Sequence, residues 1–145
     1  MTLKWISLAA TGVLVVVVVG LFLRHELFAT GPAAIAVQAV AVVLMVWARL
    51  SFGLRSFHAG ANPTAGGLVT KGPYGLVRHP IYAAILLFLW TGFSSHASVL
   101  TACVTLVASI ALAVRMFTEE RLMVERYPEY REYAARTKRV IPFVL

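Results

Sequence analysis

Trp5–Leu23 reads WISLAATGVLVVVVVGLFL and contains no charged side chain. A helix rises by about 1.5 Å per residue, so it needs about 20 residues to cross the apolar layer of a bilayer. This stretch comes close to that length. We expect it to be a retained membrane helix rather than a signal peptide, because it is longer than a usual signal core and no small-x-small cleavage pattern directly follows it.

The rest of the chain is similarly apolar: 60% of its 145 residues are hydrophobic and only 13% are charged. A soluble domain of this size needs more polar surface to cover its core, so the composition excludes an ordinary soluble protein. The length favours a single domain, 1–145. We therefore predict an all-α integral membrane helical bundle with about four transmembrane helices, near residues 5–23, 33–50, 78–93 and 97–116, and a cytoplasmic helical cap over 117–145.

The third apolar segment is the shortest. Ile81–Phe93 reaches the length of a span only if Tyr74–Pro80 adds to it, and otherwise it is partly re-entrant. The fourth segment leads into good helix formers over Arg115–Arg126, so we expect its helix to continue into the cytoplasm until Pro128 interrupts it. A second short helix is predicted over Glu129–Lys138.

Positive charges are distributed unevenly along the chain. Of its 13 Lys and Arg residues, only Arg24 lies between the first two apolar segments, and none lies in the Ser94–His96 turn. Four crossings place the other basic regions on one side, which the positive-inside rule assigns to the cytoplasm together with both termini. The net charge of +7 thus indicates membrane topology and anionic lipid rather than nucleic acid. We expect an integral protein of a bacterial inner membrane.

The first polar motif is GPYGLVRHPIY, residues 72–82. Its Gly-Pro start is typical of a tight turn, and Pro80 suits the first turn of a helix, where its missing N–H costs nothing. The free N–H groups of that helix, its dipole and Arg78 would then form a site for a carboxylate or phosphate. The alternative is that Arg78 and His79 only flank a membrane helix and contact lipid headgroups.

The second polar motif is RMFTEE, residues 115–120. Arg115 and Glu119 have i, i+4 spacing and can pair, whereas Glu120 points about 100° further round the helix. Acidic residues close to a membrane boundary are costly unless they are paired or functional. A ligand amine, ribose hydroxyls or a sulfonium cation would each suit a carboxylate here. The alternative is a solvated helix face with ordinary ion pairs.

The third polar motif is YPEYREYAARTKRVIP, residues 127–142. Tyr130 and Tyr133 have i, i+3 spacing, so their rings share one face of a helix. The alternative is an aromatic belt with snorkelling cations. This motif and the long polar segment Ser51–His79 are predicted on the same side of the membrane, where they would cover the mouth of the bundle and form the site.

Together the three motifs resemble the isoprenylcysteine carboxyl methyltransferase family of membrane enzymes, which is related to the phospholipid N-methyltransferases. The resemblance runs from Leu68 to Pro142. It implies an S-adenosylmethionine site at the cytoplasmic membrane face, with S-adenosylhomocysteine as the product and no metal. The cofactor-binding residues that it implies are Tyr74, Val77, Arg78, His79, Tyr82, Glu119, Glu120 and Tyr130, and the catalytic residues that it implies are Arg136, Glu120 and Tyr133.

For such an enzyme, the protein mainly holds the nucleophile, the methyl carbon and the sulfur in line. A carboxylate acceptor would need a cation such as Arg136, and an amine acceptor would have to lose a proton, for which Glu120 or His79 is a candidate. The acceptor that we expect is a lipophilic small molecule, such as an isoprenylcysteine-like carboxylate, another lipid or a small thiol. We expect a lipid acceptor to enter sideways between the helices.

Two other functions fit the same residues. Sterol-reductase-like membrane proteins, which use NADPH, are similar around the Arg-His-Pro-x-Tyr stretch at residues 78–82. A non-enzymatic membrane subunit could also have kept the fold and lost the activity. The sequence determines neither the methyl acceptor nor the oligomeric state.

Overall fold

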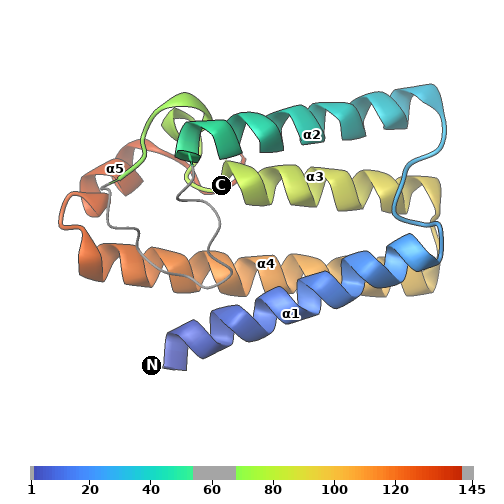
Figure 1. Ribbon diagram of the computed structural model, residues 1–145, viewed down its shortest axis with the longest axis horizontal. Helices are drawn as coiled ribbons and strands as arrows, with labels where there is room; N and C mark the ends of the chain where they lie inside the picture. Colours follow the sequence, from blue (N-terminus) through green and yellow to red (C-terminus); the bar gives the residue numbers. More distant parts are fainter. Residues whose placement is uncertain (1, 54–67, 142–145) are drawn as a thin grey trace.

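The computed structural model describes residues 2–53 and 68–141. The regular elements of this part of the chain are all helices, and its only bridge between extended segments is isolated, so the predicted all-α class is confirmed (Figure 1). The loop signals predicted between residues 54 and 67 lie outside the described residues. The elements are α1 (Thr2–Leu23), α2 (Pro32–Phe52), the 3-10 turn η2 (Gly72–Gly75), α3 (Pro80–Ser95), α4 (Val99–Arg126) and α5 (Tyr130–Arg136).

The helix ends follow from local sequence. A proline occupies the first turn of α2 and of α3, as expected for Pro80. A capping box starts α4: the Ser98 hydroxyl accepts from the Thr101 N–H at 3.1 Å, and the Thr101 hydroxyl accepts from the Ser98 N–H at 2.9 Å. α4 then continues unbroken for 28 residues and ends just before Pro128, so the predicted extension beyond the apolar segment is confirmed.

Three helices are long and apolar enough to cross a membrane: α1 over Leu3–Leu23, α2 and α4. Large apolar side chains point outward from them, and Val16 and Val43 are 71% and 67% exposed. A soluble protein rarely exposes so much apolar surface, so this is a membrane protein. α3 is a shorter apolar helix of 16 residues that lies beside α2 along the bundle (Figure 1).

The helices pack as two pairs, α2 against α3 and α1 against α4 (Figure 1). At the end of the bundle away from α5, the buried side-chain amide of Gln38 holds the loop between α1 and α2 in place. Its nitrogen donates to the carbonyls of Leu27 at 3.0 Å and Phe88 at 3.1 Å, and its oxygen accepts from the Ala29 N–H at 2.8 Å. A fully satisfied buried amide of this kind rigidifies its surroundings. The polar motifs lie at the opposite end.

Gly72 brings η2 into close contact with the end of α2. Its φ of +62° lies in the left-handed region, and a Cβ added there would overlap the Ser51 hydroxyl. Gly72→Ala should therefore strain the backbone, displace η2 and lower the free energy of unfolding by about 1–3 kcal/mol. Thermal unfolding in detergent micelles measures the change.

Gly12→Ala is the matched control, because an added Cβ at Gly12 would meet no atom within 4 Å. In the middle of a helix this change should be neutral or slightly stabilising. Equal unfolding midpoints for the two variants would contradict the role given to Gly72.

Candidate functional site

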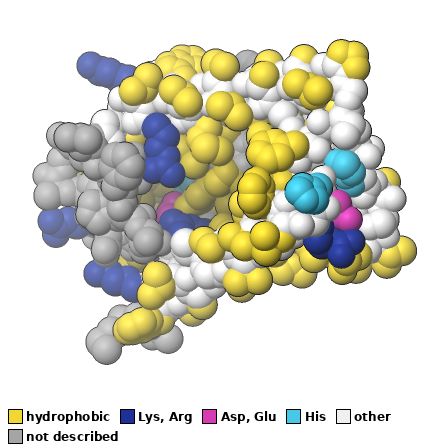
Figure 2. All heavy atoms as spheres, turned by 45° about the vertical axis from the view of Figure 1, so that its right-hand side comes forward, with side chains coloured by type: hydrophobic (Ala, Val, Ile, Leu, Met, Phe, Trp, Pro, Cys, Tyr) yellow, Lys and Arg dark blue, Asp and Glu magenta, His cyan; other side chains and the backbone are white. Residues whose placement is uncertain are grey.

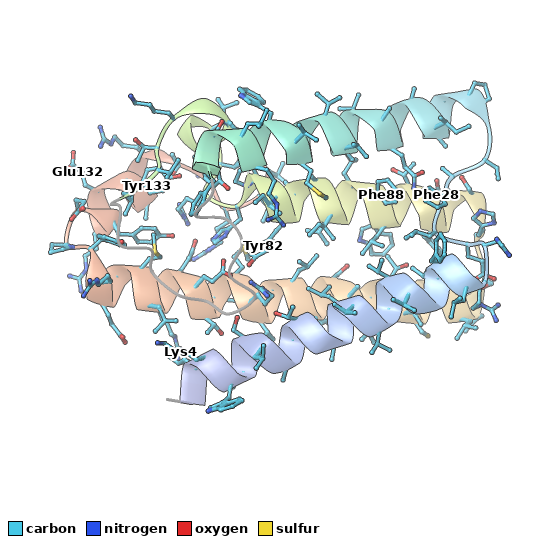
Figure 3. All side chains as sticks on the ribbon, in the orientation of Figure 1. Lys4, Phe28, Tyr82, Phe88, Glu132 and Tyr133 are labelled. Carbon is cyan, nitrogen blue, oxygen red and sulfur yellow. The ribbon has the colours of Figure 1, made fainter. Side chains whose placement is uncertain are left out.

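The three polar motifs meet at the end of the bundle where η2, the start of α3, the last turns of α4 and α5 come together (Figures 1 and 3). Val77 is buried and forms a parallel bridge with Lys138. The N–H of Arg78 donates to the Lys138 carbonyl at 2.7 Å, and the N–H of His79 donates to the Arg139 carbonyl at 2.9 Å. These bonds dock residues 130–141, here called the C-terminal arm, onto the start of α3.

Arg78 fastens the C-terminal arm through its side chain. Its Nε donates to Glu120 Oε1 at 2.8 Å, and its Nη1 donates to the carbonyls of Ala134, at 2.8 Å, and of Thr137. Carbonyls at the end of a helix lack partners within the helix, so Arg78 caps α5 while it pairs with α4. The sequence predicted that this guanidinium would hold an anionic ligand. In the structure this buried guanidinium is bound to an oxygen of Glu120 and to two carbonyls of the docked arm, and its role toward an anionic ligand stays a prediction.

Glu120 is the acceptor for three side chains. Besides Arg78, His79 Nε2 lies 3.3 Å from Oε1, and Arg139 Nε donates to Oε2 at 3.1 Å. These donors differ from Arg115 and Tyr82, which bind Glu119, in keeping with the predicted 100° offset between the two side chains. Three donors stabilise the ionised carboxylate, so its main role in this structure is to hold the C-terminal arm. Its role as a proton acceptor stays a prediction.

Glu119 uses only one of its two oxygens within the described part of the chain. Oε1 accepts from Arg115 Nη2 at 2.9 Å, which confirms the predicted i, i+4 pair, and from the Tyr82 hydroxyl at 2.5 Å. Arg115 Nε also donates to the Tyr82 oxygen at 3.0 Å, which closes a triangle. Oε2 accepts no hydrogen bond there and lies 3.9 Å from His79 Nδ1. It is therefore the carboxylate oxygen best placed to receive a ligand.

His79 stands between the two glutamates. One ring nitrogen faces Glu119 and the other faces Glu120, and the side chain is only 9% exposed. Its ring stacks on Tyr82 with an interplanar angle of 6° and a centroid distance of 5.3 Å. This stacking and the two facing carboxylates fix the orientation of the imidazole in the site.

The tyrosines of the C-terminal arm are buried. The rings of Tyr130 and Tyr133 pack edge to face at 5.8 Å, which confirms that they share one face of α5. The Tyr133 hydroxyl donates to the Tyr74 carbonyl at 2.7 Å. Burial raises the pKa of Tyr133 to about 12 and also raises the pKa of Tyr74 and of Tyr130. All three are neutral phenols near pH 7, so Tyr133 serves here as a hydrogen-bond donor that joins the arm to η2.

Arg136 is not brought to this cluster. Its side chain is 72% exposed, and its Nη2 lies 3.3 Å from Glu132 Oε1 on the same helix. The buried positions of the arm are Tyr130, Tyr133 and Thr137, which leaves Arg136 on the outer face. Its predicted role toward the methyl acceptor is not tested by this geometry.

Two residues at the site were not predicted from the sequence. Arg139 pairs with Glu120 and lies over the ring of Phe117 at 5.2 Å. Thr11 of α1 accepts a hydrogen bond from Arg115 Nη1. Arg139 has no local signal, because it depends on the long-range docking of the arm. Thr11 has one, because it stands one helical turn after Ser7 in the uncharged and largely apolar stretch Trp5–Leu23.

The surface beside the cluster is hollowed. Figure 2 shows hydrophobic side chains around this hollow, with acidic, basic and histidine side chains visible inside it. In Figure 3, Tyr82 lies between α3 and α4. Over residues 2–53 and 68–141, no group of three or more His, Cys, Asp and Glu side chains is placed to hold a metal ion. The arrangement thus combines polar groups that could orient a ligand with an apolar entrance.

Comparisons with known proteins identify relatives and a family by sequence. The chain is 38% identical over 76 residues to the cobalt-zinc-cadmium resistance protein CzcN of Cupriavidus metallidurans, and 33% identical over 81 residues to the nickel-cobalt-cadmium resistance protein NccN of Alcaligenes xylosoxydans xylosoxydans. Each match covers 52% of this chain but only 35% and 36% of the two relatives. No solved structure matches the chain. The family model described as phospholipid methyltransferase matches residues 26–130, which include the first two polar motifs, and the chain therefore belongs to the phospholipid methyltransferase family.

Proposed function

We propose that this membrane protein uses S-adenosylmethionine to methylate a lipophilic acceptor. Its family is a methyltransferase family. The observation that carries the proposal is the convergence of His79, Tyr82 and the twin glutamates on one end of the bundle, with Glu119 Oε2 left available for a ligand. The nearby hollow with its apolar entrance fits an acceptor that comes from the membrane (Figure 2).

The residues present fit this cofactor. S-adenosylmethionine carries an amine, ribose hydroxyls and a sulfonium cation, and Glu119 Oε2 can accept from or attract each of these. When bound, the cofactor supplies the electrophilic methyl carbon. We propose that Glu119, His79 and Tyr82 contact it. The other predicted cofactor residues would then hold the surrounding segments in place. They are Tyr74, Val77, Arg78, Glu120 and Tyr130.

The chemistry of the methyl acceptor determines which other side chain takes part in the reaction. His79 can hold the proton that an amine acceptor must release, because it is fixed between two carboxylates. A carboxylate acceptor needs no base but needs a cation. We propose Arg136 for contact with the headgroup of such an acceptor, since its exposed guanidinium stands on the outer face of the C-terminal arm.

For the membrane arrangement we propose four crossings, with both termini and the site on the cytoplasmic side of a bacterial inner membrane. The start of α1 and the C-terminal arm lie at the same end of the bundle in Figure 1, which supports an even number of crossings. The Lys and Arg residues at this end of the bundle support its assignment to the cytoplasmic side. In this arrangement the water-soluble cofactor enters from the cytoplasm and a lipid acceptor enters between helices.

Calorimetry of the purified protein in detergent micelles tests the proposal. S-adenosylhomocysteine should bind with a measurable heat, because it carries the amine and ribose groups that Glu119 would contact. NADPH, titrated in parallel, should give none, and binding of NADPH instead would favour the sterol-reductase-like alternative. A well-folded protein that binds neither would contradict an enzymatic role. Mass spectrometry of lipid extracts after incubation with methyl-labelled cofactor would then identify the acceptor.

A further inference from the structure

α1 lies outside the segment that matches the family, which begins at residue 26. Much of its surface is apolar and points outward, as the 71% exposure of Val16 illustrates. These two features are those of a helix that serves only as a membrane anchor. One face of α1 does not fit that description, because it carries the polar residues Ser7 and Thr11 one helical turn apart, and Ser7 is fully buried against the rest of the bundle.

Thr11 is oriented as an acceptor toward α4. Its hydroxyl donates to the Ser7 carbonyl at 2.9 Å, and its oxygen accepts from Arg115 Nη1. A hydroxyl has one hydrogen and two lone pairs. Because the hydrogen is directed to the Ser7 carbonyl, the oxygen accepts from the guanidinium through a lone pair, and the helix itself sets the direction of that lone pair.

Arg115 connects three helices through its three nitrogens. Nη1 contacts Thr11 on α1, Nε contacts Tyr82 on α3, and Nη2 contacts Glu119 on α4. Its side chain is only 10% exposed. A guanidinium is planar with donors in a fixed fork, so fixing one nitrogen constrains the other two. The orientation of Glu119 therefore depends on a contact made by α1.

We infer that Thr11 is a positioning residue of the site: it fixes the plane of the Arg115 guanidinium, and through it the direction in which Glu119 presents Oε2 to a ligand. α1 then belongs to the binding framework and is more than an anchor. This inference rests on the proposed function in that its ligand is S-adenosylhomocysteine.

Thr11→Val tests the inference, because valine keeps the shape of threonine and removes the acceptor. It should weaken S-adenosylhomocysteine binding about tenfold in calorimetry, since the buried Arg115 guanidinium loses the acceptor that α1 contributes to its orientation. Thr11→Ser keeps the hydroxyl and should bind as the unchanged protein does. Thr91→Val is the matched control: its hydroxyl also donates to a carbonyl one turn earlier, that of Leu87 at 2.6 Å, but it accepts nothing from Arg115.

A second measurement separates this inference from the proposed function. In protein labelled with ¹⁵N-arginine, Arg115→Lys assigns the Nε–H signal of Arg115. Thr11→Val should shift that signal and speed its hydrogen exchange, whereas Thr91→Val should leave it unchanged. If Thr11→Val does not fold, Thr11→Ala replaces it as the variant without an acceptor.

An unmoved Arg115 signal would overturn the inference, and so would full affinity in a variant whose signal has moved. A tenfold loss in Thr11→Ser as well would also overturn it. If the unchanged protein binds no S-adenosylhomocysteine, the proposed function fails. The Arg115 signal then decides alone whether Thr11 fixes the guanidinium.

Discussion

Replacing Arg78 with alanine is expected to undock the C-terminal arm and to lower the free energy of unfolding by about 3–5 kcal/mol. The buried guanidinium joins Glu120 to the carbonyls of Ala134 and Thr137. Its removal leaves these buried oxygens without their donor and takes a cation from Glu120. Thermal unfolding in micelles measures the loss of stability, and limited trypsin cleavage after Lys138 reports whether the arm has separated.

Arg131→Ala is the control for this change, because Arg131 is an exposed arginine on α5, the helix that Arg78 caps. It should change the free energy of unfolding by less than about 0.5 kcal/mol. Arg78→Lys should behave more like alanine than like arginine, since an ammonium does not reproduce the fork of donors. An arm that trypsin cleaves no faster in Arg78→Ala than in the unchanged protein would show that Arg78 is not its fastening.

Glu119→Gln is expected to weaken S-adenosylhomocysteine binding by about tenfold to a hundredfold, with a smaller effect on stability. The amide has the size of the carboxylate but carries no charge for a ligand amine, and it offers a weaker acceptor to hydroxyls. Glu120→Gln should differ, because Arg78, His79 and Arg139 all lose a charged partner. That variant should lose binding and arm docking together.

Glu132→Gln makes the same chemical change at an exposed carboxylate that pairs only with a neighbouring exposed arginine. It should leave the calorimetric affinity unchanged. Calorimetry on the three variants under one detergent condition makes the comparison direct. Unchanged affinity in Glu119→Gln would show that the ligand does not meet Oε2.

Much of the fold could be predicted because its signals are local. Apolar segments of sufficient length predicted α1, α2 and α4, and proline set the starts of α2 and α3. Good helix formers after the last apolar segment predicted that α4 continues. The role of α3 as a fourth crossing stays a prediction, because its 16 residues make it shorter than a typical span.

The site was predictable only where one helix determines the geometry. The i, i+4 pair of Arg115 and Glu119, and the separate direction of Glu120, follow from helix pitch alone. The contacts of Arg78 and Arg139 depend instead on how the C-terminal arm docks, which no local pattern contains. The exposure of Arg136 also depends on how the arm docks, and its role toward the acceptor stays a prediction.

The pairing of residues 77–79 with residues 138–139 also imposes an order on biosynthesis. Helices α1 to α3 end more than 40 residues before Lys138 in the chain, so they can begin to insert while the partner of residues 77–79 is still missing. During that interval Glu120 has no Arg139, and the carbonyls that Arg78 will cap have not formed. The first three helices are therefore expected to enter the membrane before the chain can bind any cofactor, and competence arises only once residues 138–139 have left the ribosome and docked.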